Sequence, residues 1–107
     1  MAKEKRMLTF DKTELSVVDL SGKNPVRHNL TYDKIISIQI EHSEKKVFFF
    51  MKKPCDVILI NRRGSDKLIP VYSLNDPFFE EYLEGIRKFA KENRVSIYDY
   101  IANPDKK

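Results

Sequence analysis

The sequence is poor in the residues that catalytic and metal-binding sites most often use. Its 107 residues include one cysteine, two histidines and three glycines. The single Cys55 cannot form a disulfide within the chain, which favours a reducing compartment. The spacing of His28, His42 and Cys55 fits no zinc pattern, and three glycines do not make a glycine-rich phosphate loop. We therefore expect no catalytic residues, no metal and no cofactor.

Long hydrophobic runs are also absent. The longest, at 47–51 and 57–60, are far shorter than the ~20 residues that a membrane-spanning helix needs. The charged start of the chain is not followed by the apolar stretch of a secretory signal. These absences lead us to expect a soluble, cytoplasmic protein.

The composition that remains is that of a folded domain. Hydrophobic residues make up 41% of the chain and charged residues 34%, which is typical of globular rather than disordered proteins. The length suits one domain and not two. We expect a single domain over residues 7–102, with flexible tails at 1–6 and 103–107.

Most of the chain follows a β pattern. Short apolar runs alternate with turn residues at roughly the eight- to twelve-residue spacing of small sandwiches and barrels. The clearest alternation places Ile36, Ile38 and Ile40 on one face of a strand. Pro70 cannot donate to a ladder, so its strand should lie at a sheet edge. The expected strands span residues 8–10, 14–20, 26–32, 35–41, 46–51, 56–61 and 67–72, with polar turns at 42–45 and 52–55.

One amphipathic helix follows these strands. Asn75 or Asp76 can cap it, and Pro77 suits its first turn. Asn93 is the expected end, and residues 96–101 fit either an extra strand or a short second helix. The apolar stripe at helical spacing consists of Phe78, Phe79, Tyr82, Leu83, Ile86, Phe89 and Ala90.

Seven short strands closed by one helix resemble the layout of bacterial pleckstrin-homology-like (PH-like) domains. The stretch Leu30, Tyr32, Asp33, Ile35 and Ile38 is similar to the apolar-x-Tyr-acidic-x-Ile-x-x-Ile signature that leads into their fourth strand. The aromatic start of the helix from residue 77 is similar to their closing helix. The resemblance covers about residues 8–94 and rests on loose, mostly structural motifs.

This resemblance implies two near-orthogonal sheets of four and three strands, with the helix filling the open corner. It also implies a ligand end built from the first, third and sixth connections between strands, here around Lys12, around 33–34 and around 62–64. The basic pattern that reads phosphoinositides in eukaryotic relatives is replaced by Glu14 and Ser16. We therefore do not expect specific headgroup recognition through that pattern.

Positive charge is concentrated in the middle of the chain. The net charge is +4, but residues 45–67 alone hold seven basic and two acidic side chains. Such lysines can simply solubilise hydrophobic strands and protect their edges. They can equally form a surface for phosphate groups or an acidic partner.

These observations favour a non-catalytic binding or scaffolding domain. The first hypothesis is protein recognition or self-association, either along a sheet edge or in a groove between the helix and the fifth expected strand. The expected groove residues are Phe49, Met51, Glu81 and Arg87.

The alternative hypothesis is binding to an anion, either nucleic acid or an acidic membrane surface. Here the contacts come from turns between strands, at Lys12, Lys34, Arg62 and Arg63. Binding of this kind weakens steeply as salt is added.

Overall fold

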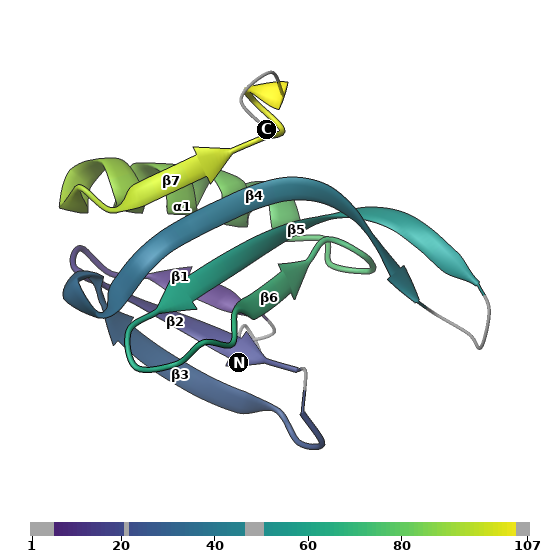
Figure 1. Ribbon diagram of the computed structural model, residues 1–107, viewed down its shortest axis with the longest axis horizontal. Helices are drawn as coiled ribbons and strands as arrows, with labels where there is room; N and C mark the ends of the chain where they lie inside the picture. The colour runs from purple at the N-terminus through teal and green to yellow at the C-terminus, as the bar shows by residue number, and fades with distance from the viewer. Residues whose placement is uncertain (1–5, 21, 47–50, 105–107) are drawn as a thin grey trace.

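A computed structural model describes residues 6–20, 22–46 and 51–104 of the protein. In this part of the chain, six strands precede one α-helix and a final strand follows it (Figure 1). The elements are β1 (Leu8–Phe10), β2 (Glu14–Asp19), β3 (Val26–Thr31), the 3-10 turn η2 (Tyr32–Lys34), β4 (Ile35–Lys46), β5 (Lys52–Arg62), β6 (Ile69–Tyr72), α1 (Phe79–Asn93) and β7 (Ser96–Asp99).

The strands form two sheets. The first contains three antiparallel strands in the order β1-β2-β3, and the second has the order β6-β5-β4-β7. The last strand, β7, lies parallel to β4. The expectation of a mainly β domain with two sheets and one C-terminal helix is confirmed. Of the two alternatives for residues 96–101, the extra strand is found: Ser96–Asp99 follows the helix and completes the four-stranded sheet.

The isoleucines at the start of β4 do not follow the simple alternation of buried and exposed positions that the sequence predicts. Ile38 and Ile40 are fully buried as expected, whereas Ile36 is 45% exposed. The pairing with β5 shifts register between Ile35 and Ser37. This irregularity changes the inward face, so Ile35 enters the core in place of Ile36.

The pairing of β4 with β5 extends much further than the sequence pattern suggests. The ladder runs without further interruption to the pair Lys46–Lys52. The expected turns at 42–45 and 52–55 are therefore wrong, because both stretches are strand. The expected strand at 46–51 is not tested in its middle, because residues 47–50, which include Phe49, lie outside the described residues.

Pro54 suggested a turn, yet it sits inside β5. Pro54 pairs with Glu44 of β4, but β6 ends at Tyr72, which pairs with Val57, so β5 has no neighbour on its other side at Pro54. The carbonyl of Asp56 accepts a hydrogen bond from the amide of Ser73, which shows that even-numbered residues of β5 direct their backbone groups to the β6 side. The N–H that Pro54 lacks therefore falls on an open edge, where its absence leaves the ladder intact.

Helix α1 bridges the two sheets along one side. It contacts β1, the edge strand of the first sheet, and β7, the edge strand of the second (Figure 1). Its buried residues match the expected stripe, with Phe78 only half-buried just before the helix: Phe79, Tyr82, Leu83, Ile86, Phe89 and Ala90.

Both ends of α1 have local explanations. The helix begins at Phe79, a few residues after the expected caps, and the Asp76 carboxylate accepts a hydrogen bond from the Phe78 amide. It ends at Asn93 as expected. Arg94 then adopts a left-handed conformation with φ 57°, and the amide of Val95 donates back to the Ala90 carbonyl.

The helix approaches β1 closely because one of its residues is glycine. The ring of Phe10 lies over Gly85 and also packs against Phe89, with ring centroids 5.9 Å apart. A Cβ atom on Gly85 would lie 2.5 Å from Cε2 of Phe10, well inside van der Waals contact. The glycine thus allows a contact that any side chain would obstruct.

The Arg87–Asp99 ion pair joins α1 to β7. Arg87 Nε donates to Asp99 Oδ2 at 2.7 Å, and the Asp99 side chain is only 11% exposed. Burial raises the pKa of Asp99, but hydrogen bonds from Arg87 and from the amide of Ala102 outweigh burial and bring this pKa below its usual range. The charged form of Asp99 therefore stabilises the folded state.

The substitution Gly85→Ala tests the helix–strand contact. In an open helix it would stabilise the protein by about 1 kcal/mol. Here we expect a net loss of about 1 kcal/mol, because the new methyl group displaces Phe10 from a packed position. Urea unfolding measures the difference, with the exposed neighbour Glu84→Ala as the control. A stabilised Gly85→Ala variant would contradict the contact.

The substitution Asp99→Asn tests the ion pair through its pH dependence. We expect a loss of about 1 kcal/mol at neutral pH, kept small because Arg87 is partly in solvent. The folded-state pKa is lowered, so the stabilisation is present above the ordinary carboxyl pKa of about 4 and disappears as the pH falls through the lower folded value. Denaturant titrations of both proteins over this range measure it. A difference that is the same at all pH values would contradict the assignment.

Candidate functional site

An apolar pocket lies at the end of the molecule where the β4–β5 ladder leaves the sheet. It has a volume of about 340 Å³, which falls within the range of small ligand sites. Its residues come from the position before β1, the end of β2 and the position after it, the outer part of β4, strand β6 and the loop that leads to α1. They are Met7, Val18, Leu20, Lys45, Pro70, Val71, Tyr72, Leu74, Asn75 and Asp76. We call this the end pocket.

Backbone hydrogen bonds hold the walls of the end pocket in place. The amide of Val18 donates to the carbonyl of Met7 at 2.9 Å, which joins two of its segments. On the opposite wall, Ser73 bonds to Asp56 of β5 twice, through its amide and through its hydroxyl. Asn75 then adopts φ 61°, a left-handed conformation that asparagine tolerates better than most residues. The pocket is therefore formed by anchored backbone.

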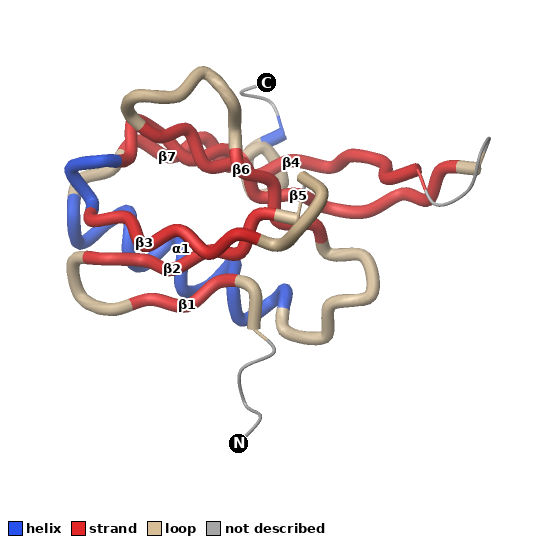
Figure 2. The backbone as a smooth tube through the Cα atoms, turned by 90° about the horizontal axis from the view of Figure 1, so that it is seen from below, coloured by secondary structure: helices blue, strands red, loops and turns tan. Residues whose placement is uncertain are grey.

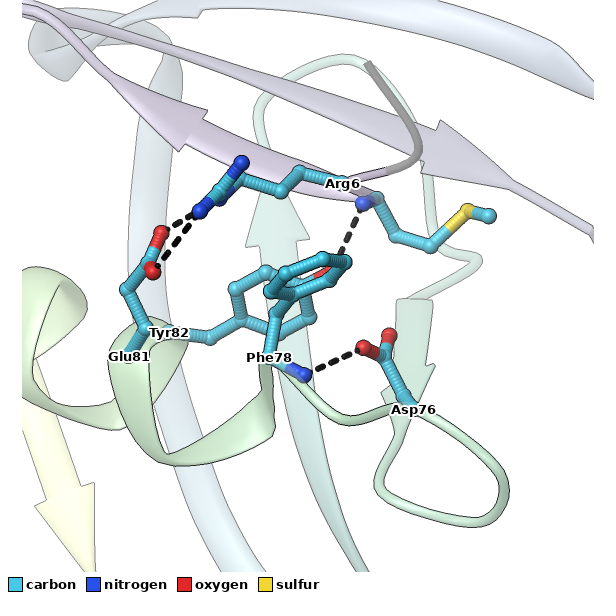
Figure 3. A network of polar contacts seen from close by, with 6 residues as sticks. Arg6, Asp76, Phe78, Glu81 and Tyr82 are labelled. Carbon is cyan, nitrogen blue, oxygen red and sulfur yellow. Dashed lines mark hydrogen bonds and ion pairs between the residues drawn. The ribbon is translucent and has the colours of Figure 1, made fainter. Parts of the chain in front are cut away.

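A network of polar contacts beside this pocket joins residues 6 and 7 to helix α1 (Figure 3). Arg6 makes a two-point ion pair with Glu81, at 2.6 and 3.1 Å, and its guanidinium lies 4.3 Å from the ring centroid of Phe78. The amide of Met7 donates to the hydroxyl of Tyr82 at 2.7 Å. These contacts attach residues 6 and 7 to α1, so Arg6 is held although the sequence pattern placed it in a flexible tail. The rest of that tail, residues 1–5, and residues 105–107 of the other lie outside the described part.

The pKa shifts in the protein arise from burial and structural pairing. Burial raises the pKa of Tyr82 to about 12, with a hydrogen bond to Asp76 acting in the same direction and the Met7 amide opposing it. Arg6 lowers the pKa of Glu81. Burial, together with the nearby Asp56, raises the pKa of Cys55, which keeps its thiol protonated. Each shift has a structural cause, and none activates a nucleophile.

Metal-binding residue types are dispersed over the described residues. No three His, Cys, Asp or Glu side chains in that part of the chain gather in a way that would hold a metal ion. His28 accepts a hydrogen bond from Arg62 at 3.3 Å, whereas His42 pairs across the strands with Asp56 at 2.6 Å. The two histidines belong to different sheets.

Lys45 connects the pocket with the projecting strands. Its ammonium group lies 4.8 Å from the ring centroid of Tyr72, within the range of a cation–π contact. Lys45 belongs to β4 and Tyr72 to β6, so the pair spans the mouth of the end pocket. The positive charge of Lys45 therefore borders a mainly apolar cavity, whose other polar lining residues are Asn75 and Asp76.

The basic residues expected to bind anions gather at the opposite end of β5. The connection at Lys12 reaches η2 through the amide of Tyr32, which donates to the Thr13 carbonyl, and η2 in turn bonds to Arg63. The three connections that the PH-like resemblance singled out therefore lie near one another. Lys52 and Arg62 stand at opposite ends of β5.

The two arginines at that end are directed at the protein itself. Arg63 Nε donates to the carbonyl of Asp33 at 2.8 Å. Arg62 is half-buried against His28, and its buried Nε has no hydrogen-bond partner within the described residues. Lys12 and Lys34 are exposed. The structure thus brings the four residues to one end, where both arginine side chains bond to neighbouring groups of the protein and both lysines are exposed.

The residues expected to line a helix–strand groove do not gather. Glu81 is paired with Arg6, Arg87 with Asp99, and Met51 lies 47% exposed at the outer end of β5. Phe49 lies outside the described residues. A groove of about 530 Å³ does follow the helix, but it lies against β1 and includes Thr9, Glu81 and Lys88.

The end pocket was missed by the sequence analysis because its residues are distant in the chain. One signal was available at Leu20, an apolar residue that ends its strand beside a polar loop and is 53% exposed. Nothing in the pattern indicated that Val18 and Tyr72 would face the same cavity.

Comparisons with known proteins give no relative. The chain matches no family model, and no curated protein and no solved structure is significantly similar to it. The resemblance to PH-like domains therefore stays a prediction, and the functional argument rests on the surfaces described above.

The helix content bears on membrane association. Within the described residues, none of the helical segments combines the length and the apolar character needed to cross a membrane.

An alkaline titration tests the burial of Tyr82. The chain has five tyrosines, and we expect one to ionise only near pH 12, with this late step absent in Tyr82→Phe. Because the folded-state pKa is raised, stability should fall between the ordinary tyrosine pKa of about 10 and that value. The ultraviolet absorbance of tyrosinate measures the ionisation. Five tyrosines that ionise together near their ordinary pKa would show that Tyr82 is accessible to water.

Proposed function

We propose that the protein is a non-catalytic binding domain that takes an extended segment of a partner protein along β6, with one apolar side chain of the partner in the end pocket. The end pocket carries this proposal. Its residues are mostly apolar, its walls are anchored backbone, and three of its members belong to β6.

The backbone of β6 supports the extended mode of binding. Strand β6 is at the edge of its sheet, as Pro70 predicted. Because the Ser73 amide bonds to β5, the odd-numbered residues of β6 face that strand. The backbone groups of Pro70 and Tyr72 therefore point away from β5, toward the side where a partner strand would pair.

The charge at the pocket mouth indicates the chemistry of the partner. Lys45 borders the cavity above Tyr72. A segment with an acidic residue next to its apolar anchor would pair with this lysine, and desolvation in the pocket would strengthen that contact. We infer further that the domain acts in the cytoplasm, where the free thiol of Cys55 stays reduced.

A displayed library of random peptides tests the proposal. Selected peptides should share an apolar residue beside an acidic one, and backbone amide shifts on binding should map to Val18, Tyr72 and Leu74. We expect Leu20→Ser to weaken binding at least about tenfold, since it removes apolar surface at the pocket mouth. Leu20 is 53% exposed, so its loss should leave the unfolding temperature nearly unchanged.

The matched control is Ile36→Ser, which removes a similarly exposed aliphatic side chain, 45% exposed, outside the pocket. It should bind the peptides as the native protein does. Shifts that map to the groove between β1 and α1, or equal binding by Leu20→Ser, would contradict the end pocket as the site. Concentration-dependent sedimentation without peptide would instead point to self-association along the same edge.

A further inference from the structure

The outer half of the β4–β5 ladder projects from the body of the protein. Strand β7 pairs with β4 only from Ser37 to Ile40. Strand β6 pairs with β5 only from Val57 to Ile60. Beyond these points the two strands pair with each other, and Asp56 at the base of the segment also bonds to Ser73 (Figures 1 and 2). We call this two-stranded segment, residues 42–46 and 52–56, the arm.

Four lysines occupy the last two rungs of the arm. Lys45 pairs directly with Lys53, and Lys46 pairs with Lys52. Residues directly opposite each other on antiparallel strands share a face, and like charges in such pairs are destabilising. Residues 47–50 lie outside the described part, and their sequence adds no charge to offset the lysines. The end of the arm thus concentrates positive charge, and the repulsion between these charges destabilises the pairing of its two strands.

The lysines are not neutralised by the rest of the described structure. The ion pairs found there join Arg6 to Glu81, His42 to Asp56 and Arg87 to Asp99, and none involves these four residues. Lys46, Lys52 and Lys53 are exposed, and Lys45 is half-covered by Tyr72. Such a cluster of positive charge would attract an external anion.

The distribution of charge along the arm favours a flat anionic surface over a nucleic-acid groove. A two-stranded ribbon can enter the major groove of DNA, but its sides then face the phosphates. The sides of this arm carry Glu44 and Asp56, with Glu41 at its base, and these carboxylates would be repelled. Among the described residues, the last pairs of the arm consist of the four lysines alone, and Met51 beside them is 47% exposed.

We propose that the end of the arm docks on an anionic lipid bilayer, with its four lysines against the headgroups. The proposal does not depend on the end pocket, whose partner is a protein. A lysine near an anionic membrane surface strengthens binding about fivefold, and the attraction is screened by salt. Four lysines on one short ribbon are therefore enough for reversible, salt-sensitive attachment.

Vesicle co-sedimentation of the full chain tests the proposal. The probes are vesicles of phosphatidylcholine alone and vesicles in which part of it is replaced by phosphatidylglycerol. We expect binding to the anionic vesicles only, weakening as salt is raised. The variant Lys46→Gln/Lys52→Gln/Lys53→Gln should bind more weakly by on the order of a hundredfold.

The matched control neutralises three exposed lysines elsewhere, in Lys12→Gln/Lys34→Gln/Lys67→Gln. Both variants change the net charge equally, so a loss confined to the arm variant identifies the arm. Removing like-charged pairs should not lower the unfolding temperature, which separates lost binding from lost folding. Equal losses in both variants, undiminished binding by the arm variant, or tighter binding to duplex DNA than to the anionic vesicles would each overturn the proposal.

Discussion

The pairing of β4 with β5 is the constraint on which the rest of the structure depends. Its inner half forms the centre of the four-stranded sheet, with β6 on one side and β7 on the other. The register shift near Ile35 brings Ile35 into the core together with Ile38 and Ile40. Because the same ladder continues past both neighbours, it also produces an arm that neither sheet covers. Core and projection are thus two parts of one continuous pairing.

The two candidate binding surfaces lie where this ladder leaves the body. Lys45 belongs to both, since it contacts Tyr72 at the mouth of the end pocket and pairs with Lys53 on the arm. An arm held against an anionic surface would bring the edge of β6 close to that surface. In this account the domain presents a protein-binding pocket beside a membrane, and each surface has its own test.

The sequence predicts the parts of the fold that depend on local pattern. The apolar stripe of α1 and the edge position of Pro70 were both visible, because each follows from the backbone geometry of its own element. The turn predicted at Pro54 was wrong, because a proline is compatible with a strand where its missing N–H falls on an open edge. The end pocket could not be predicted, because Val18 and Tyr72 meet only through the packing of two sheets. The pairing partner of residues 96–99 is a long-range contact of the same kind.

Nuclear Overhauser effects between the Hα protons of opposite residues test the continuous ladder most directly. In non-hydrogen-bonded antiparallel pairs the Cα atoms are only about 4.5 Å apart, so the Hα protons are in close contact. The pair Ile40–Ile58 lies in the sheet, and Glu44–Pro54 and Lys46–Lys52 lie in the arm. The account predicts strong effects at all three pairs. Effects at Ile40–Ile58 alone would show that the ladder ends at the edge of the sheet. The arm would then not exist, and the account would be contradicted.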